Sequence, residues 1–255
     1  MSKHHGKFFW YDLMTTDTKA AEKFYRDVIG WDAKDAGSPD HTYTLLSKGA
    51  DTVGGLMPIP KKACDSGASP CWTGYIAVDD VDAYADKVKA AGGSVRRAPV
   101  DVPGILRFAV VADPYGASFI IFKGYSNEER PTVQPGTPGH IGWHELMAGD
   151  REGAFAFYAK LFGWTKAEAM ESPAGVYQLF ATGDAPVGGM MTKMPQMPAS
   201  FWLYYFNVAG LDAAIGRVKK SGGRIMNGPM QVPGGSWIAQ CADPQGAMFA
   251  MVGPK

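Results

Sequence analysis

Cysteine is scarce in this sequence of 255 residues. The three cysteines, Cys64, Cys71 and Cys241, are an odd set without a Cys-x-x-Cys spacing. This argues against a disulfide framework and against a zinc knuckle. Cys64 and Cys71 share a loop and could bridge under oxidation, but we expect two reduced thiols.

An excess of positive or negative charge and long apolar runs are also lacking. Lys+Arg and Asp+Glu balance at 25 each, so nothing favours nucleic acid or an acidic membrane surface as a partner. No apolar run reaches the roughly 18 residues that a membrane span needs, and the first residues contain no signal-peptide core. We therefore predict a cytoplasmic protein with no nucleic-acid or membrane partner.

Three common enzyme motifs are missing as well. The sequence contains no Walker loop, no dinucleotide-binding fingerprint and no Gly-x-Ser-x-Gly elbow. With 46% hydrophobic and 20% charged residues, it can nevertheless bury two ordinary cores, and it is too apolar to be disordered.

What the chain does contain is an internal duplication. Residues 10–31, WYDLMTTDTKAAEKFYRDVIGW, recur without a gap as residues 143–164, WHELMAGDREGAFAFYAKLFGW. The identical pairs are Trp10/Trp143, Leu13/Leu146, Met14/Met147, Asp17/Asp150, Ala21/Ala154, Phe24/Phe157, Tyr25/Tyr158, Gly30/Gly163 and Trp31/Trp164.

The repeat continues at a slightly shifted offset almost to the end of each half. Gly54-Gly55 matches Gly188-Gly189, and the Asp-Pro-x-Gly-Ala turn at Asp113 matches the one at Asp243. Two halves of this size agree with the usual domain size, so we predict domains at residues 1–125 and 140–255, joined by a Pro-rich linker at 126–139.

Hydrophobic periodicity predicts two βαβββ units in each half. Residues 8–15 alternate like a strand, Asp17 can cap a helix that ends at Gly30, and short strands follow at 31–34, 43–47 and 53–58. The second unit has a strand at 72–78, a helix capped by Asp80 and stopped by Gly92-Gly93, and strands at 94–97, 106–112 and 117–123. After the linker both units return, between residues 141 and 252.

Four such units, with Phe-Tyr in the first helix, Gly-Trp at its end and an Asp-Pro-x-Gly turn before the last strand, resemble the vicinal oxygen chelate superfamily. This superfamily contains glyoxalases, extradiol dioxygenases and bleomycin-resistance proteins. The similarity is strongest to its two-domain glyoxalase-like branch, which includes hydroxylases and a mycobacterial antigen. The resemblance implies an α+β fold in which paired units form cup-shaped mixed sheets, with the helices outside and the ligand or metal in the cup.

The resemblance also implies where metal ligands would lie. The ligand positions on the first strands of the units correspond to Trp10 and Trp143 and, approximately, to Thr73 and Leu203. The ligand positions on the last strands correspond to Ile120 and Ala250 in the second unit of each half, and they fall near Gly55 and Gly189 in the first units. Zinc, nickel and iron sites need nitrogen, thiolate or carboxylate donors. We therefore predict that the family metal site is lost and that no cofactor is bound, which argues against metal-dependent glyoxalase or ring-cleaving chemistry.

Two equivalent carboxylates, Asp12 and Glu145, follow the tryptophans at the next inward position of the predicted strands. A carboxylate in an apolar pocket has a raised pKa, which suits a general acid or base. The alternative is that each carboxylate accepts structural hydrogen bonds. His144 would point to the opposite face from Glu145, so a catalytic pair of these two neighbours is awkward.

Aromatic and methionine side chains alternate onto the same face as the lost ligands, where they could line a pocket for a flat or aliphatic ligand or could be plain core. They are Trp10, Met14, Tyr75, Trp143, Met147 and Tyr205.

Two functions remain open at this point. The chain could be a glyoxalase-like enzyme, a lyase or a hydroxylase, that acts on a small organic molecule by carboxylate chemistry, or a non-catalytic module that sequesters such a molecule. We expect a monomer with an internal pseudo-two-fold, with a homodimer as the alternative.

Overall fold

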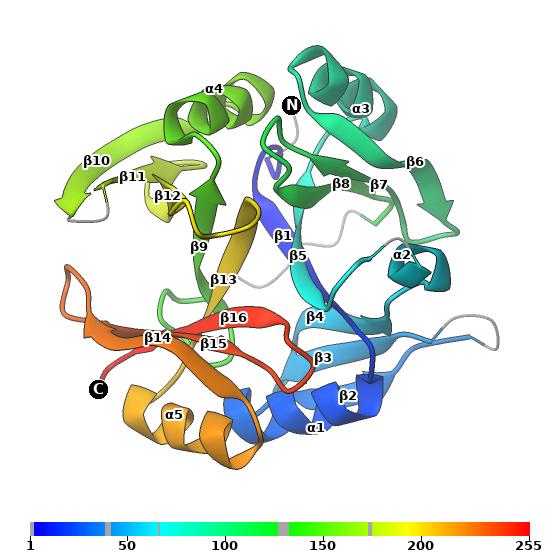
Figure 1. Ribbon diagram of the computed structural model, residues 1–255. Coiled ribbons are helices and arrows are strands. Elements are labelled where there is room, and N and C mark those ends of the chain that lie inside the picture. Colours follow the sequence, from blue (N-terminus) through cyan, green and yellow to red (C-terminus); the bar gives the residue numbers. More distant parts are fainter. Residues whose placement is uncertain (1–2, 39–41, 66, 127–132, 173–174) are drawn as a thin grey trace. The chain divides into compact units, whose positions relative to one another are not determined.

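The computed structural model describes residues 3–38, 42–65, 67–126, 133–172 and 175–255. The first half of the chain contains two βαβββ modules (Figure 1). The first module consists of β1 (Phe8–Thr15), α1 (Thr18–Ile29), β2 (Asp32–Asp35), β3 (Thr44–Lys48) and β4 (Asp51–Pro58). After the short helix α2 (Lys61–Asp65), the second module consists of β5 (Cys71–Ala77), α3 (Val81–Ala90), β6 (Ser94–Val102), β7 (Leu106–Ala112) and β8 (Ser118–Gly124).

The second half repeats this order. Its first module consists of β9 (Ile141–Ala148), α4 (Arg151–Phe162), β10 (Thr165–Ser172), β11 (Gly175–Ala181) and β12 (Pro186–Thr192). Its second module consists of β13 (Phe201–Asn207), α5 (Leu211–Lys220), β14 (Arg224–Gln231), β15 (Trp237–Ala242) and β16 (Met248–Gly253).

Each half contributes one eight-stranded mixed sheet. The strand orders are β2-β3-β4-β1-β5-β8-β7-β6 and β10-β11-β12-β9-β13-β16-β15-β14, so the two sheets have the same topology. The predicted α+β fold of four βαβββ units is confirmed. The pattern did not reveal α2, which contains no buried residue.

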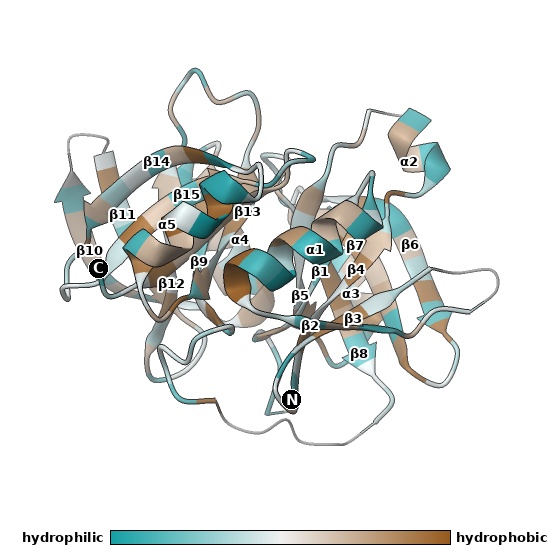
Figure 2. Cartoon of the chain, turned by 90° about the horizontal axis from the view of Figure 1, so that it is seen from below, coloured by the Kyte–Doolittle hydropathy of each residue, from teal (hydrophilic) through white to brown (hydrophobic). Residues whose placement is uncertain are grey.

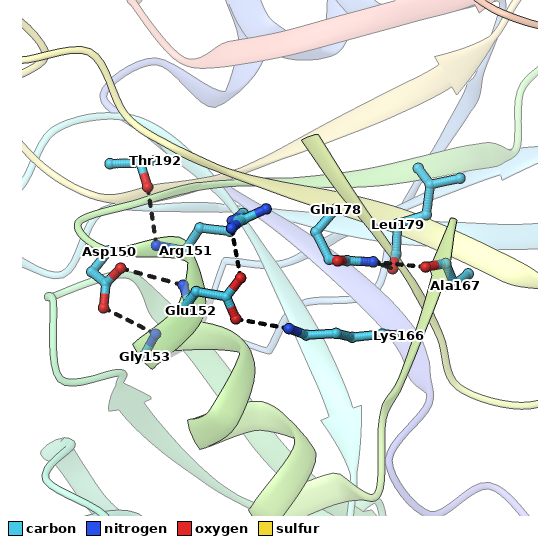
Figure 3. A network of polar contacts seen from close by, with 9 residues as sticks. All are labelled: Asp150, Arg151, Glu152, Gly153, Lys166, Ala167, Gln178, Leu179 and Thr192. Carbon is cyan, nitrogen blue, oxygen red and sulfur yellow. Dashed lines mark hydrogen bonds and ion pairs between the residues drawn. The ribbon is translucent and has the colours of Figure 1, made fainter. Parts of the chain in front are cut away.

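The helix boundaries follow from capping. Asp17 accepts a hydrogen bond from the Ala20 amide, and Gly30 ends α1 in the left-handed conformation that favours glycine. At α4, Asp150 accepts hydrogen bonds from the Glu152 and Gly153 amides (Figure 3). Both hydrophilic and hydrophobic residues lie along α1 and α5 (Figure 2), and the buried residues of these two helices are hydrophobic.

Compact packing does not follow the two halves of the sequence. One compact unit comprises Met1–Trp10, Thr73–Arg130 and Trp143–Trp202, and the other comprises Tyr11–Trp72, Pro131–Gly142 and Leu203–Lys255. Each unit therefore combines one module from each half. The division into domains 1–125 and 140–255 remains a prediction, and part of the predicted linker lies outside the described residues.

Inside each unit, the recurring motifs of one module bond to those of the other. In the unit that contains α1 and α5, the Trp72 indole N–H donates to the Tyr25 hydroxyl at 2.8 Å, and this hydroxyl donates to Asp243 at 3.2 Å. Burial, followed by the charge of Asp243, raises the pKa of Tyr25 well above its ordinary value. The tyrosine therefore remains a neutral donor.

The unit that contains α3 and α4 has the equivalent chain. Trp202 donates to the Tyr158 hydroxyl at 3.0 Å, which donates to Asp113 at 3.3 Å. Burial raises the pKa of Asp113, although the amides of Ala117 and Tyr115 donate to its carboxylate and oppose that shift. The Phe-Tyr and Asp-Pro-x-Gly motifs are thus hydrogen-bonding partners.

Among the described residues, no helix is long and apolar enough to cross a membrane. The three cysteines, all within the described part of the chain, are not joined by a disulfide.

Replacing Tyr25 or Tyr158 with Phe should lower the free energy of unfolding by about 1–3 kcal/mol, because a buried indole N–H loses its acceptor and one oxygen of a buried carboxylate loses its tyrosine donor. Urea denaturation at neutral pH measures this. Tyr115→Phe is the matched control, because the Tyr115 hydroxyl donates to Asp150 from an exposed position. Its effect should stay within about 0.5 kcal/mol, and an equal loss in the control would contradict the assignment.

Candidate functional site

On the central strands β1 and β9, different kinds of side chain lie on the two faces of the sheet. Leu13 and Leu146 are fully buried on one face of these strands. Trp10 and Trp143 lie on the other face, together with the carboxylates two residues further on, because alternate residues of a strand share a face. Both tryptophans are only partly buried. We call the face of each sheet that carries Trp10 or Trp143 the inner face.

Glu145 is the best-defined polar group on the inner face of β9. Its side chain is 6% exposed, and the Tyr177 hydroxyl is hydrogen-bonded to its carboxylate. The same hydroxyl accepts a hydrogen bond of 2.8 Å from the Trp143 indole N–H. Desolvation, followed by the charge of Glu145, raises the pKa of Tyr177 well above its ordinary value, so this tyrosine is a neutral donor to the carboxylate.

Asp12 has the equivalent arrangement on β1. It is 2% exposed and accepts a hydrogen bond of 2.8 Å from the Tyr43 hydroxyl. Tyr43 directly precedes β3, as Tyr177 lies near the start of β11. Each predicted acid–base residue is therefore buried and accepts a hydrogen bond from a tyrosine hydroxyl.

Glycine makes room for both phenols. In the parallel pairs β1–β4 and β9–β12, Asp12 is in register with Gly55, and Glu145 with Gly189. A Cβ at Gly55 would lie 2.0 Å from the Tyr43 hydroxyl, and a Cβ at Gly189 would lie 2.2 Å from the Tyr177 ring. The preceding glycines allow a close approach of backbone, since a Cβ at Gly54 would lie 2.6 Å from the carbonyl oxygen of Tyr11.

His144 points away from Glu145. Its ring stacks on Phe8 at a centroid distance of 4.1 Å, and Nδ1 lies 2.7 Å from the carbonyl oxygen of Val187. Burial lowers the pKa of His144 to about 4, against the opposing effect of that hydrogen bond. At neutral pH the imidazole is neutral and donates from Nδ1 to Val187.

The remaining predicted lining residues fall into separate groups. Trp10 packs against an apolar cluster that contains Tyr75. Tyr205 is buried and accepts a hydrogen bond of 3.1 Å from Gln240. Met147 is buried and Met14 half-buried.

Comparison with known proteins decides the family. A model of the Glyoxalase/Bleomycin resistance protein/Dioxygenase superfamily matches residues 7–121 and 138–251. The chain belongs to this superfamily. The chain is 35% identical over 249 residues to the Mycobacterium bovis protein named "Putative glyoxylase CFP32". The aligned region covers 96% of this chain and 94% of the relative.

A second group of relatives bears a different name. The chain is 33% identical over 257 residues to "Anthracycline biosynthesis protein DnrV" of Streptomyces peucetius, covering 95% of this chain and 91% of the relative. Among solved structures, the Mn(II)-bound glyoxalase from Novosphingobium aromaticivorans has the same fold, with a TM-score of 0.66 at 18% identity over 98% of this chain and 82% of that chain.

The superfamily often uses a metal, but the residues present do not fit one at the family position. Trp10, Trp143, Ile120 and Ala250 offer no donor atom that binds zinc, nickel, iron or manganese. The glycines in register with Asp12 and Glu145 have no side chain and are covered by phenols. Within the described ranges, no three His, Cys, Asp or Glu side chains gather in a group that could hold a metal.

Sequence reasoning missed the phenols Tyr43 and Tyr177. A signal was present, because they recur at the same offset as the two glycine pairs. Their role depends on a contact between neighbouring strands that only the register reveals.

Gly55→Ala and Gly189→Ala should each destabilise the protein by roughly 1–3 kcal/mol, because the added methyl group collides with a phenol held on a carboxylate. Urea denaturation measures the change. Gly216→Ala is the control, since a Cβ there meets nothing within 4 Å in α5. Alanine in a helix interior should be neutral or stabilising by up to about 1 kcal/mol. Equal destabilisation of all three variants would contradict this account of the glycines.

His144 should make stability depend on pH. The unfolded chain takes up the proton near pH 6.5 but the folded chain only near pH 4, so the free energy of unfolding falls as pH drops through this window. The loss should be on the order of 1–3 kcal/mol. His144→Asn retains a donor for Val187 without titrating, and should flatten the difference in stability between pH 7 and pH 5. An unchanged slope in this variant would exclude His144 as the source.

Proposed function

We propose that this superfamily member binds a small organic molecule on its inner faces and transforms it by acid–base chemistry at Asp12 and Glu145, without a metal at the family position. The observation that supports this most is the duplicated pair of a buried carboxylate and a phenol. A carboxylate has about four lone-pair sites, so it can accept a phenol hydrogen bond and a substrate proton together.

The phenol contributes orientation and a neutral hydrogen bond. The raised pKa of Tyr177 keeps its hydroxyl protonated, so it steadies the Glu145 carboxylate in one rotamer. A positioned carboxylate of this kind suits removal of a proton from a carbon beside a carbonyl group or from a phenolic hydroxyl. The Trp143 indole, which donates to Tyr177, adds a flat surface on the same face of β9 as Glu145.

The names of the relatives suggest two substrate classes. One is a glyoxylase substrate such as a dicarbonyl–thiol adduct, and the other is the oxygenated fused-ring skeleton of anthracyclines. We favour the fused-ring class, because partly buried indoles suit a flat ligand.

A second function is non-catalytic binding of the same ligand class. The observation that favours it is that Asp12 and Glu145 are each already hydrogen-bonded by a tyrosine, which is also how a structural carboxylate is satisfied. Under this alternative the carboxylates support the fold and the ligand is sequestered unchanged.

The test uses a hemithioacetal of methylglyoxal and a sulfonated dihydroxyanthraquinone, with turnover followed by product analysis and binding by tryptophan fluorescence. We expect Asp12→Asn or Glu145→Gln to lower turnover at least about 100-fold with little change in melting temperature. Glu152→Gln, at an exposed carboxylate on α4, should leave turnover unchanged.

Stoichiometric quenching without turnover would instead identify a binding protein. Activity should survive chelation, and elemental analysis should find no stoichiometric transition metal. Loss of activity on chelation with recovery on adding Mn²⁺ or Zn²⁺ would refute the proposed metal-free chemistry.

A further inference from the structure

The inner faces of the second modules of the two halves can be compared position by position. In the first half, Tyr75, Ile120 and Val110 form one row across β5, β8 and β7. In the second half, Tyr205, Ala250 and Gln240 form the same row across β13, β16 and β15. Side chains in register across neighbouring strands share a face, so the two rows are equivalent surfaces.

The row of the first half is apolar. Tyr75 and Ile120 belong to a buried cluster with Ala77 and Phe122, against which Trp10, Phe9, Leu106, Phe108 and Val110 pack. On the edge strand β6, Arg97 is in register with Val110, as Asn227 is with Gln240 in the second half. The Arg97 guanidinium lies 5.0 Å from the centroid of the Phe108 ring, so this surface offers hydrocarbon and aromatic contacts with one cation at its edge.

The row of the second half is polar. Gln240 Nε2 donates to the Tyr205 hydroxyl at 3.1 Å, and Asn227 Nδ2 donates to Gln240 Oε1 at 3.4 Å. Asn227 is exposed, Gln240 half-buried and Tyr205 buried, so the chain of hydrogen bonds runs inward from the surface. Gln240 is in register with Ala250, the smallest side chain of the row.

Several positions change in the same direction, from hydrocarbon or aromatic side chains in the first half to smaller or polar ones in the second. They are Phe9/Gly142, Ala77/Asn207, Leu106/Ser236, Phe108/Ile238, Val110/Gln240, Ile120/Ala250 and Phe122/Val252. Thr73/Leu203 and Ser118/Met248 change in the opposite direction.

The fold does not require this polar row. The first half builds the same three strands with Val110 where the second has Gln240, and a half-buried amide costs free energy unless it is hydrogen-bonded. A primary amide both donates and accepts, which matches a ligand that carries hydroxyl and carbonyl oxygens. A site built to bond such groups discriminates against analogues that lack them.

We propose that Gln240, which is hydrogen-bonded to Tyr205 and Asn227, is the specificity-determining residue of the second half. It forms hydrogen bonds with hydroxyl or carbonyl oxygens of a fused-ring ligand. The equivalent surface of the first half has Val110 in place of this amide and contributes mainly apolar contact. This inference rests on the proposed function and adds the ligand class and the half of the chain that selects it.

The experiment compares two probes with one skeleton, a sulfonated dihydroxyanthraquinone and the sulfonated anthraquinone without the hydroxyls. Their dissociation constants are measured by quenching of tryptophan fluorescence. The natural protein should bind the hydroxylated probe about tenfold more tightly. Gln240→Met, which keeps the length of the side chain but removes the amide, should reduce this preference to about onefold. Asn227→Ala should reduce it to about threefold, because Gln240 loses one support.

Val110→Ala is the matched control in the first half and should keep the tenfold preference. Melting temperatures establish that each variant is folded, and Asn227→Ala, at an exposed position, supplies the answer if Gln240→Met does not fold. An unchanged preference in the Gln240 and Asn227 variants, or an equal loss in Val110→Ala, would overturn the inference. Tight binding of both probes without preference would overturn it while leaving the proposed function standing. No binding of either probe and no turnover would overturn both.

Discussion

The buried hydrogen-bond chain from a tryptophan through a tyrosine to an aspartate organises the rest of the structure. It occurs once in each compact unit, as Trp72–Tyr25–Asp243 and as Trp202–Tyr158–Asp113. In each case the tryptophan, the tyrosine and the aspartate come from three different modules, and leaving any of these buried polar groups without its partner costs free energy. The chain therefore specifies which modules pack together.

A second constraint acts on the inner faces. Each carboxylate of the central strands is buried beside a glycine, and the absent side chain leaves a space that a phenol fills. A side chain at Gly55 or Gly189 would overlap with Tyr43 or Tyr177. The phenol–carboxylate pair therefore depends on glycine at this position.

Duplication provides an internal comparison that a single domain lacks. Features that recur, such as the tyrosine on each carboxylate, are compatible with the fold in both contexts. Features that differ, such as Gln240 against Val110, are not required by it, since the same strands form with either residue. Divergence between the halves is consequently the more informative guide to ligand recognition.

The sequence by itself determined the four βαβββ units, because alternation, helix caps such as Asp17 and stops such as Gly30 are local effects. It also placed Asp12 and Glu145 on one face of their strands, because that depends only on strand alternation. The tertiary structure alone decided that Tyr25 bonds to Asp243, that Tyr43 covers Gly55, and that each compact unit combines modules from both halves. Those outcomes depend on strand register and on which buried donor meets which acceptor, and both are set by contacts between residues distant in the chain.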